Sequence, residues 1–374
     1  MDLTVITTYR CDSKCQMCYI WQNPSVPKEE ISLETLRKLP SNFDNINISG
    51  GEPTNRKDLS EIVDILVTKG KVVGISSNGL HYEKILPIIK KYPNVKVRFS
   101  LEGSEITNNS IRGEKDGFNK KVNGMKKLIE AGGKDLGFAF VIQDENVKEL
   151  MYVYEITEKL GIELSTSTLH NAWQFHKNDN YFYEKIKVAK KVEPLITALL
   201  RSNSVKNWFR AYLNLGLINK ILGKYRLMKC TAGTDFIFID PWSDVYACNV
   251  RSDLYIGNLV QNDWKTVLES PKANEIRRKV DQCKQNCWMI TTATTSIRNH
   301  YVPAIPRISP LMWVVINKVR LRIGMNINFS KYVDYGNVKA DPIIKRQSYL
   351  NIPFKKKIET REEKLYKDQT YVNG

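Results

Sequence analysis

The stretch Cys11-Asp12-Ser13-Lys14-Cys15-Gln16-Met17-Cys18-Tyr19 decides most of what this sequence predicts. It follows an apolar run, residues 3–8, that is typical of a buried β-strand. Three thiolates at this spacing can hold three irons of a four-iron cluster and leave the fourth iron without a protein ligand. An open metal position can bind and activate a small molecule, whereas a fully ligated one cannot. The loop therefore predicts a catalytic iron–sulfur site.

A second motif, Ser49-Gly50-Gly51-Glu52-Pro53, follows the apolar run 46–48. Glycines let the backbone approach a ligand closely, and a carboxylate or carbonyl oxygen can accept a hydrogen bond from an ammonium group. The CxxxCxxC loop and this GGEP motif together resemble the radical S-adenosylmethionine (radical SAM) superfamily. The resemblance implies SAM on the open iron, with its methionine amino group at Gly50, Gly51, Glu52 and Pro53. A zinc site built from Cys11, Cys15 and Cys18 is the alternative, and it leaves GGEP unexplained.

Short apolar runs alternate with amphipathic stretches through the first half of the chain. The expected strands are residues 3–8, 46–49, 72–76, 95–101, 136–142 and 162–167, and the expected helices are 32–39, 58–69, 82–91, 119–131 and 147–160. Ser32 is placed to cap the first helix, and Gly70, Gly132 and Gly161 fall where helices should stop. The alternation predicts an α/β fold with a parallel sheet. The resemblance implies a partial (β/α)6 TIM-type barrel with its sites at the carboxyl ends of the strands.

Polar residues gather at the ends of the third and fourth expected strands. By resemblance they contact the ribose and carboxylate of SAM or the substrate, and these candidates are Ser77, Asn78, Ser100, Glu102 and Arg112. Tyr19 could stack on adenine. The alternatives are ordinary turn residues and a core aromatic. His170 follows the sixth strand and could face the cavity, although a lone histidine is more often structural.

The second cysteine set is Cys230, Cys248, Cys283 and Cys287. Between its first two members, residues 236–247 predict a β-hairpin with a Pro-Trp-Ser-Asp turn, and residues 264–280 predict a helix. This segment resembles the twitch domain, the short relative of the SPASM domain, whose four cysteines hold an auxiliary [4Fe–4S] cluster. Four thiolates can satisfy all four irons. A structural zinc ion on the same four cysteines is the alternative, and the spacing does not exclude it.

The two sites together use all seven cysteines of the chain. No thiol would remain to return a hydrogen atom to a substrate radical, as many radical epimerases are thought to do. A fully ligated auxiliary cluster could instead accept an electron, which favours a two-electron oxidation. Seven cysteines in a reducing compartment also favour metal ligation over disulfides.

The 374 residues carry a net charge of +17, and residues 291–374 hold 15 Lys and Arg against 6 Asp and Glu. The expected organisation is a radical SAM core at 1–200, a helical linker at 201–229, a twitch or SPASM-like domain at 230–290 and a basic C-terminal extension at 291–374. Residues 308–327 are apolar and basic, and they could lie on an anionic membrane surface or pack on the barrel. Met1 leads directly into a strand and no run is long enough to span a bilayer, so we expect a cytoplasmic protein.

The resemblance implies reductive cleavage of SAM to a 5′-deoxyadenosyl radical, with electrons from a flavodoxin or ferredoxin. The positive charge favours an anionic small substrate, such as a sugar, nucleotide sugar or lipid-linked sugar, for oxidation or epimerisation. Maturation of a ribosomally made peptide is the alternative. A zinc-bearing nucleic-acid-binding protein is a further alternative from another class, but the basic residues are dispersed and GGEP has no role in it. We therefore expect no nucleic-acid partner.

Overall fold

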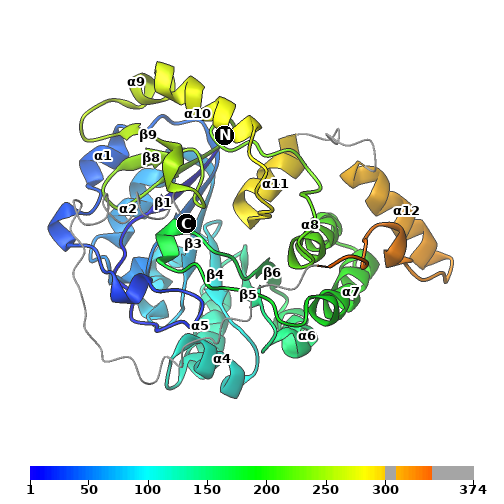
Figure 1. The fold of residues 1–374 in the computed structure, drawn as a ribbon. Coiled ribbons are helices and arrows are strands. Elements are labelled where there is room, and N and C mark those ends of the chain that lie inside the picture. The colour runs from blue at the N-terminus through cyan, green and yellow to red at the C-terminus, as the bar shows by residue number, and fades with distance from the viewer. Residues whose placement is uncertain (300–308, 339–374) are drawn as a thin grey trace.

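The computed structural model describes residues 1–299 and 309–338 (Figure 1). Within them, one nine-stranded sheet has the order β6-β5-β4-β3-β2-β1-β7-β8-β9. Every neighbouring pair from β6 along to β7 is parallel. The pairs β7–β8 and β8–β9 are antiparallel. The strands are β1 (Asp2–Ile6), β2 (Phe43–Ser49), β3 (Gly70–Ser77), β4 (Lys96–Ser100), β5 (Leu136–Ile142), β6 (Glu163–Thr168), β7 (Phe236–Ile239), β8 (Asp244–Tyr246) and β9 (Tyr255–Asn258).

Helices connect the first six strands, as the alternation predicted. They are α1 (Leu33–Arg37), α2 (Leu59–Leu66), α3 (Leu86–Lys91), α4 (Glu105–Arg112), α5 (Gly117–Glu130) and α6 (Leu150–Leu160). Ser32 caps α1 by accepting a hydrogen bond from the backbone N–H of Thr35, and Gly161 ends α6 in the left-handed region. The prediction for Gly70 was wrong, because this residue begins β3. The alternation, with its parallel strands, gives the partial TIM-type barrel that the sequence predicted.

The hairpin of the second cysteine segment is part of this sheet. Strand β7 pairs in parallel with β1, with Asp2 opposite Phe236 and Val5 opposite Ile239. The helix expected at 264–280 is two helices, α9 (Trp264–Leu268) and α10 (Pro271–Asp281). They are separate because Ser270 caps a new helix whose first residue is proline.

The remaining helices are α7 (Lys185–Arg201), α8 (Val205–Ile221), α11 (Ile290–Asn299) and α12 (Pro310–Arg322). Helix α8 contacts β6 and each of the other three, and α11 also contacts β1 and β7. Figure 1 shows α12, in orange, at the outer edge of the molecule beside α7 and α8. None of the described helices has both the length and the apolar character needed to cross a bilayer. Residues 300–308 and 339–374 of the expected basic C-terminal extension lie outside the described residues.

Candidate active site

The loop that carries Cys11, Cys15 and Cys18 follows β1 and is held from two sides. From the end of α4, the carbonyls of Arg112 and Ile111 accept hydrogen bonds from the backbone N–H groups of Lys14 and Gln16, both at 2.9 Å. From the end of β3, the amide Nδ2 of Asn78 donates to Asp12 Oδ1 at 2.6 Å and to Ser13 Oγ at 2.9 Å. The loop is thus fixed by the two segments in which Asn78 and Arg112 were predicted to contact SAM.

The three thiols lie close enough to influence one another. Burial raises the pKa of Cys18 to about 12, and the charge of Cys15 adds to the effect. Burial holds the pKa of Cys11 well above its usual value, and the charge of Cys15 is the next largest cause. Burial also raises the pKa of Cys15. These thiols stay protonated at neutral pH until a metal displaces the protons. A donor set of this kind fits iron, which binds the thiolate form.

No group of three or more His, Cys, Asp or Glu side chains in residues 1–299 and 309–338 is arranged to hold a single metal ion.

A cavity of about 270 Å³ adjoins the cysteine loop. Its wall brings together residues from the carboxyl ends of β2, β3, β4 and β6. The predicted site residues in the wall are Cys11, Cys15, Cys18, Gly50, Gly51, Ser77, Asn78, Ser100 and Arg112. Sequence reasoning missed Thr168, whose buried hydroxyl lines the cavity without a hydrogen-bond partner in the described residues. An unsatisfied buried hydroxyl is typical of a wall that binds a polar ligand.

Glu52 is not among the residues that line the cavity. Its completely buried carboxylate accepts hydrogen bonds from the backbone N–H groups of Thr54 (3.0 Å) and Asn78 (2.6 Å) and from the Ser77 hydroxyl (2.8 Å). That its carboxylate receives the SAM ammonium stays a prediction, and among the described residues Oε2 has one hydrogen-bond partner, the backbone N–H of Asn78. Glu52 ties the end of β2 to the end of β3. Pro53 also lies outside the cavity wall and begins a 3-10 helix, Pro53–Asn55.

Glu102 also lies behind the wall. Its carboxylate accepts from Arg112 Nη1 at 3.0 Å and from the backbone N–H of Val141 at 2.8 Å. Arg112 further contacts Glu114, which pairs with the buried Lys121 at 2.5 Å. Burial lowers the pKa of Lys121 to about 8, and the neighbouring Arg112 contributes. Arg112 is therefore the member of this buried ion network that reaches the cavity, and Glu102 holds it in place.

The ring of Tyr19 contacts the ammonium group of Lys177 and does not line the cavity. Lys177 Nζ lies 4.3 Å from the centroid of its ring and 3.3 Å from its hydroxyl oxygen. Tyr19 is absent from the cavity wall, so its predicted stacking on adenine has no support in this geometry. Lys177 is buried and was not foreseen, because nothing in a single lysine predicts burial.

Gly50 and Gly51 have a structural need for glycine in addition to any role in binding. A Cβ at Gly50 would lie 2.6 Å from the carbonyl oxygen of Thr8, and one at Gly51 would lie 2.6 Å from that of Arg10. The contacting atoms are backbone, which cannot move without displacing β1. The two glycines therefore let the end of β2 lie directly against the start of the cysteine loop.

Gly51→Ala is expected to lower the free energy of unfolding by about 1–3 kcal/mol, because the added methyl group overlaps this backbone. We also expect less iron to bind per chain. Urea unfolding and iron analysis measure the two effects. Gly74→Ala is the matched control within β3, because its Cβ would meet only the Lys96 side chain, at 3.4 Å. Equal stability of the two variants would contradict this explanation.

The second cysteine set gathers around the ends of β8 and α10. Burial raises the pKa of Cys248 to about 12, and the charge of Cys287 is the next largest cause. Burial also raises the pKa of Cys230, and the charges of Cys287 and Cys283 contribute to this increase. Each of the four thiols therefore lies within electrostatic reach of at least one other. The sulfur of Cys287 accepts a hydrogen bond from Arg226 Nη1 at 3.4 Å, and that of Cys248 accepts from the backbone N–H of Val250 at 3.2 Å.

A second cavity of about 590 Å³ extends from the first toward Cys287. Leu169, His170 and Asn180 line both cavities, so the two share a wall. The Nε2 atom of His170 is buried and has no hydrogen-bond partner in the described residues. Burial, followed by the charge of Lys220, holds the pKa of this imidazole well below its usual value, so the ring is neutral. His170 thus reaches the cavity as the sequence suggested.

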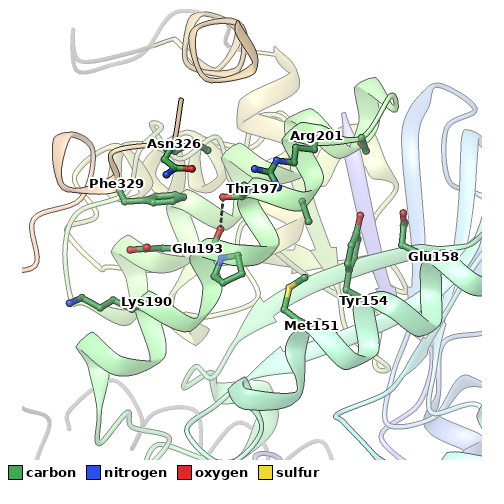
Figure 2. A pocket seen from close by; sticks show the side chains of 13 residues that line it. Met151, Tyr154, Glu158, Lys190, Glu193, Thr197, Arg201, Asn326 and Phe329 are labelled. Carbon is green, nitrogen blue, oxygen red and sulfur yellow. Dashed lines mark hydrogen bonds between the residues drawn. The ribbon is translucent and has the colours of Figure 1, made fainter. Parts of the chain in front are cut away.

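A third cavity, of about 780 Å³, lies away from both cysteine sets. Figure 2 shows it between α6, α7 and the segment around Phe329, with Tyr154 and Glu158 on one side and Lys190 and Glu193 on another. None of the predicted site residues lines it. Its charges are of both signs and it is open to solvent, so it does not qualify as the candidate active site.

Comparison with known proteins finds one family model over each of the two cysteine sets. The model of the radical SAM superfamily matches residues 5–156, and that of an iron–sulfur cluster-binding domain, SPASM, matches residues 230–288. A probable GTP 3′,8-cyclase from Saccharolobus islandicus is 28% identical over 272 residues, which cover 67% of this chain and 83% of that protein. The mycofactocin maturase MftC from Mycolicibacterium smegmatis is 25% identical over 277 residues, which cover 70% of this chain and 69% of that protein.

Among solved structures, Streptococcus suis SuiB bound to S-adenosylmethionine matches with a TM-score of 0.56 at 16% identity. The match covers 74% of this chain and 67% of SuiB, and at this identity it supports the fold. The radical SAM model covers the cysteine loop, the GGEP motif, the end of β1 and strands β2 to β5 of the parallel barrel. The SPASM model covers the second cysteine set. The chain belongs to the radical SAM superfamily: it is an enzyme of SAM and [4Fe–4S] clusters, and it carries a SPASM-type auxiliary cluster domain.

Proposed function

We propose that this enzyme oxidises an anionic small molecule bound between its two cysteine sites. In this proposal Cys11, Cys15 and Cys18 ligate the SAM-binding cluster, and Cys230, Cys248, Cys283 and Cys287 ligate the auxiliary cluster. The observation that supports it most is the shared wall of the two cavities. A substrate in the second cavity would contact His170 near the SAM site and Arg251 near the auxiliary cysteines.

The lining of the second cavity favours a negatively charged, hydroxyl-rich substrate. Its cations are Lys185, Lys220 and Arg251, and its one carboxylate, Asp253, pairs with Arg251 at 2.5 Å. Side-chain amides supply both donors and acceptors, and the lining amides are Asn171, Asn178, Asn180, Gln285 and Asn286. The Oδ1 atom of Asn286 is buried without a hydrogen-bond partner in the described residues, which leaves it available to a substrate hydroxyl. Sugar phosphates and nucleotide sugars have this combination of groups.

Oxidation is favoured over epimerisation because the proposed ligation leaves no cysteine free to return a hydrogen atom. When bound, SAM and its cluster supply a radical that removes a hydrogen atom, and the auxiliary cluster supplies a site for the second electron. The chain itself positions the substrate and excludes water. His170, with its neutral ring, can bond a substrate hydroxyl at the wall between the two sites.

The charges around the auxiliary cysteines support an electron-accepting role. Arg226 donates to both the sulfur and the carbonyl oxygen of Cys287, and its guanidinium lies 5.5 Å from the ring of Trp288. The hydrogen bond of Arg251 to Asp253 raises the pKa of Arg251, and its hydrogen bond to Cys283 raises this pKa further. Positive charge and hydrogen bonds at the sulfurs stabilise the reduced cluster and raise its reduction potential.

Arg226→Gln is expected to lower the midpoint potential of the auxiliary cluster by on the order of 50 mV, because one cationic hydrogen bond to sulfur is lost. Redox titration followed by electron paramagnetic resonance measures this change. Arg226→Lys keeps the positive charge, and its midpoint potential should lie between that of the parent and that of Arg226→Gln. Equal potentials for all three proteins would remove this argument for an electron-accepting cluster.

Peptide maturation is a second candidate, and the similarity to the mycofactocin maturase favours it. The discriminating experiment incubates the reconstituted enzyme with SAM, dithionite and separate panels of phosphorylated sugars, nucleotide sugars and short peptides. The proposal expects an anionic sugar to stimulate release of 5′-deoxyadenosine, and expects deuterium from the labelled sugar to appear in it. Transfer from a peptide alone would establish the second candidate and overturn the first.

A further inference from the structure

Helix α12 is fixed to the protein along one side. Its Ser309 cap accepts a hydrogen bond from the backbone N–H of Met312 at 3.1 Å. Trp313 is completely buried, with its ring 5.7 Å from that of Tyr212. Lys318 Nζ donates to the carbonyl of Leu200 at 2.8 Å and lies 3.9 Å from the Trp208 ring. These contacts with α7, α8 and the loop between them hold the helix in one orientation.

The opposite side of α12 is apolar as well. Each of seven large apolar residues there and in the following turn is between 44% and 65% exposed. We call them the apolar stripe: Leu311, Met312, Val315, Ile316, Val319, Ile323 and Met325. Most of them recur at spacings of three, four and five residues, which places them on one face of a helix. An exposed apolar patch of this kind marks an interaction surface.

Along the sequence, the charged residues within and next to the apolar stripe are all of one sign. No Asp or Glu occurs between residues 299 and 333, whereas Arg320, Arg322 and Lys331 do. Within the described residues, no carboxylate forms an ion pair with any of these three side chains. Apolar residues flanked by Lys and Arg are typical of a helix that lies in the plane of a membrane interface.

We propose that α12 binds flat on an anionic membrane surface, with the apolar stripe among the lipid headgroups and acyl chains. Arg320, Arg322 and Lys331 then lie at the level of the lipid phosphates. A second copy of the chain is disfavoured as the partner, because it would bring the same three cations against each other. Residues 339–374 are disfavoured as a cover, because they contain 9 Lys and Arg against 5 Asp and Glu. Anionic lipid complements this charge.

Flotation of the full-length, cluster-loaded protein with phosphatidylcholine vesicles, with or without phosphatidylglycerol, tests the proposal. Binding is expected to the anionic vesicles and should weaken as salt rises from about 0.05 to 0.5 M. The double variant Val315→Gln/Ile316→Gln should reduce partitioning at least about tenfold, because two apolar side chains no longer enter the bilayer. Ile106→Gln/Val260→Gln, at positions 84% and 70% exposed elsewhere, is the matched control and should bind as the parent does.

Two outcomes would overturn the proposal. In the first, the parent protein fails to float with anionic vesicles; in the second, both double variants lose binding equally. A dimer in solution that Val315→Gln/Ile316→Gln breaks, without vesicle binding by the parent, would identify a second copy as the partner. A lower unfolding temperature for that variant alone, again without vesicle binding, would identify another segment of the chain as the cover.

Discussion

Cys15→Ala is expected to abolish reductive cleavage of SAM, with a fall in 5′-deoxyadenosine release of more than about a hundredfold. Cys15 is the most buried cysteine of its loop, and the backbone on either side of it is bonded to the end of α4. Without its thiolate, one iron of the cluster loses its only protein ligand. Chromatographic measurement of 5′-deoxyadenosine under dithionite, with iron analysis, tests this expectation.

The auxiliary site provides the control for this variant. Cys15→Ala should lose about four irons per chain and keep about four, because the second cysteine set is intact. Loss of all iron would indicate that the chain had failed to fold. Release of 5′-deoxyadenosine at the parent rate would show that Cys15 is not a ligand of the SAM-binding cluster.

Cys248→Ala should have a different effect: SAM cleavage without substrate continues near the parent rate, but product formation stops. Cys248 is buried directly after β8, and the backbone N–H of Val250 donates to its sulfur. Its removal opens the auxiliary cluster but leaves the residues of the SAM cavity unchanged. Measuring 5′-deoxyadenosine with and without an accepted substrate, beside the oxidised product, separates the two activities.

The two cysteine variants are each other's controls. Cys15→Ala should stop both reactions, whereas Cys248→Ala should stop only the second. Full product formation by Cys248→Ala would mean that the auxiliary cluster serves the fold and takes no part in the oxidation. Loss of SAM cleavage in that variant would mean that the two sites are not independent.

Local patterns were sufficient to predict the main features of the fold. The six parallel strands, the cap at Ser32 and the stop at Gly161 follow from apolar runs and terminal residues, which depend on near neighbours. The prediction missed α4 because Glu105–Arg112 is mostly polar and buries few of its side chains. The break between α9 and α10 was also missed, although Ser270 followed by Pro271 is a recognisable helix start.

The candidate site was harder to predict where function depends on the direction of a side chain. Ser100 and Arg112 line the cavity, and their contact with SAM stays a prediction. Motif position also suggested Glu52 and Glu102, whose carboxylates bond to groups within the protein. A carboxylate at the end of a strand can face either way, and its buried partners decide which. Those partners, Ser77 and Val141 among them, come from distant segments that no local pattern connects.

The pairing of β1 with β7 has a mechanical consequence. The cysteine loop follows β1, and the segment that carries the second cysteine set includes β7, so adjacent strands of one sheet support both sites. Separating the sites would require breaking the backbone hydrogen bonds along these strands. The separation of the two cysteine sets is therefore held by the pairing of neighbouring strands and does not vary with the movement of a linker. Heating the protein should accordingly melt both sites in a single cooperative transition.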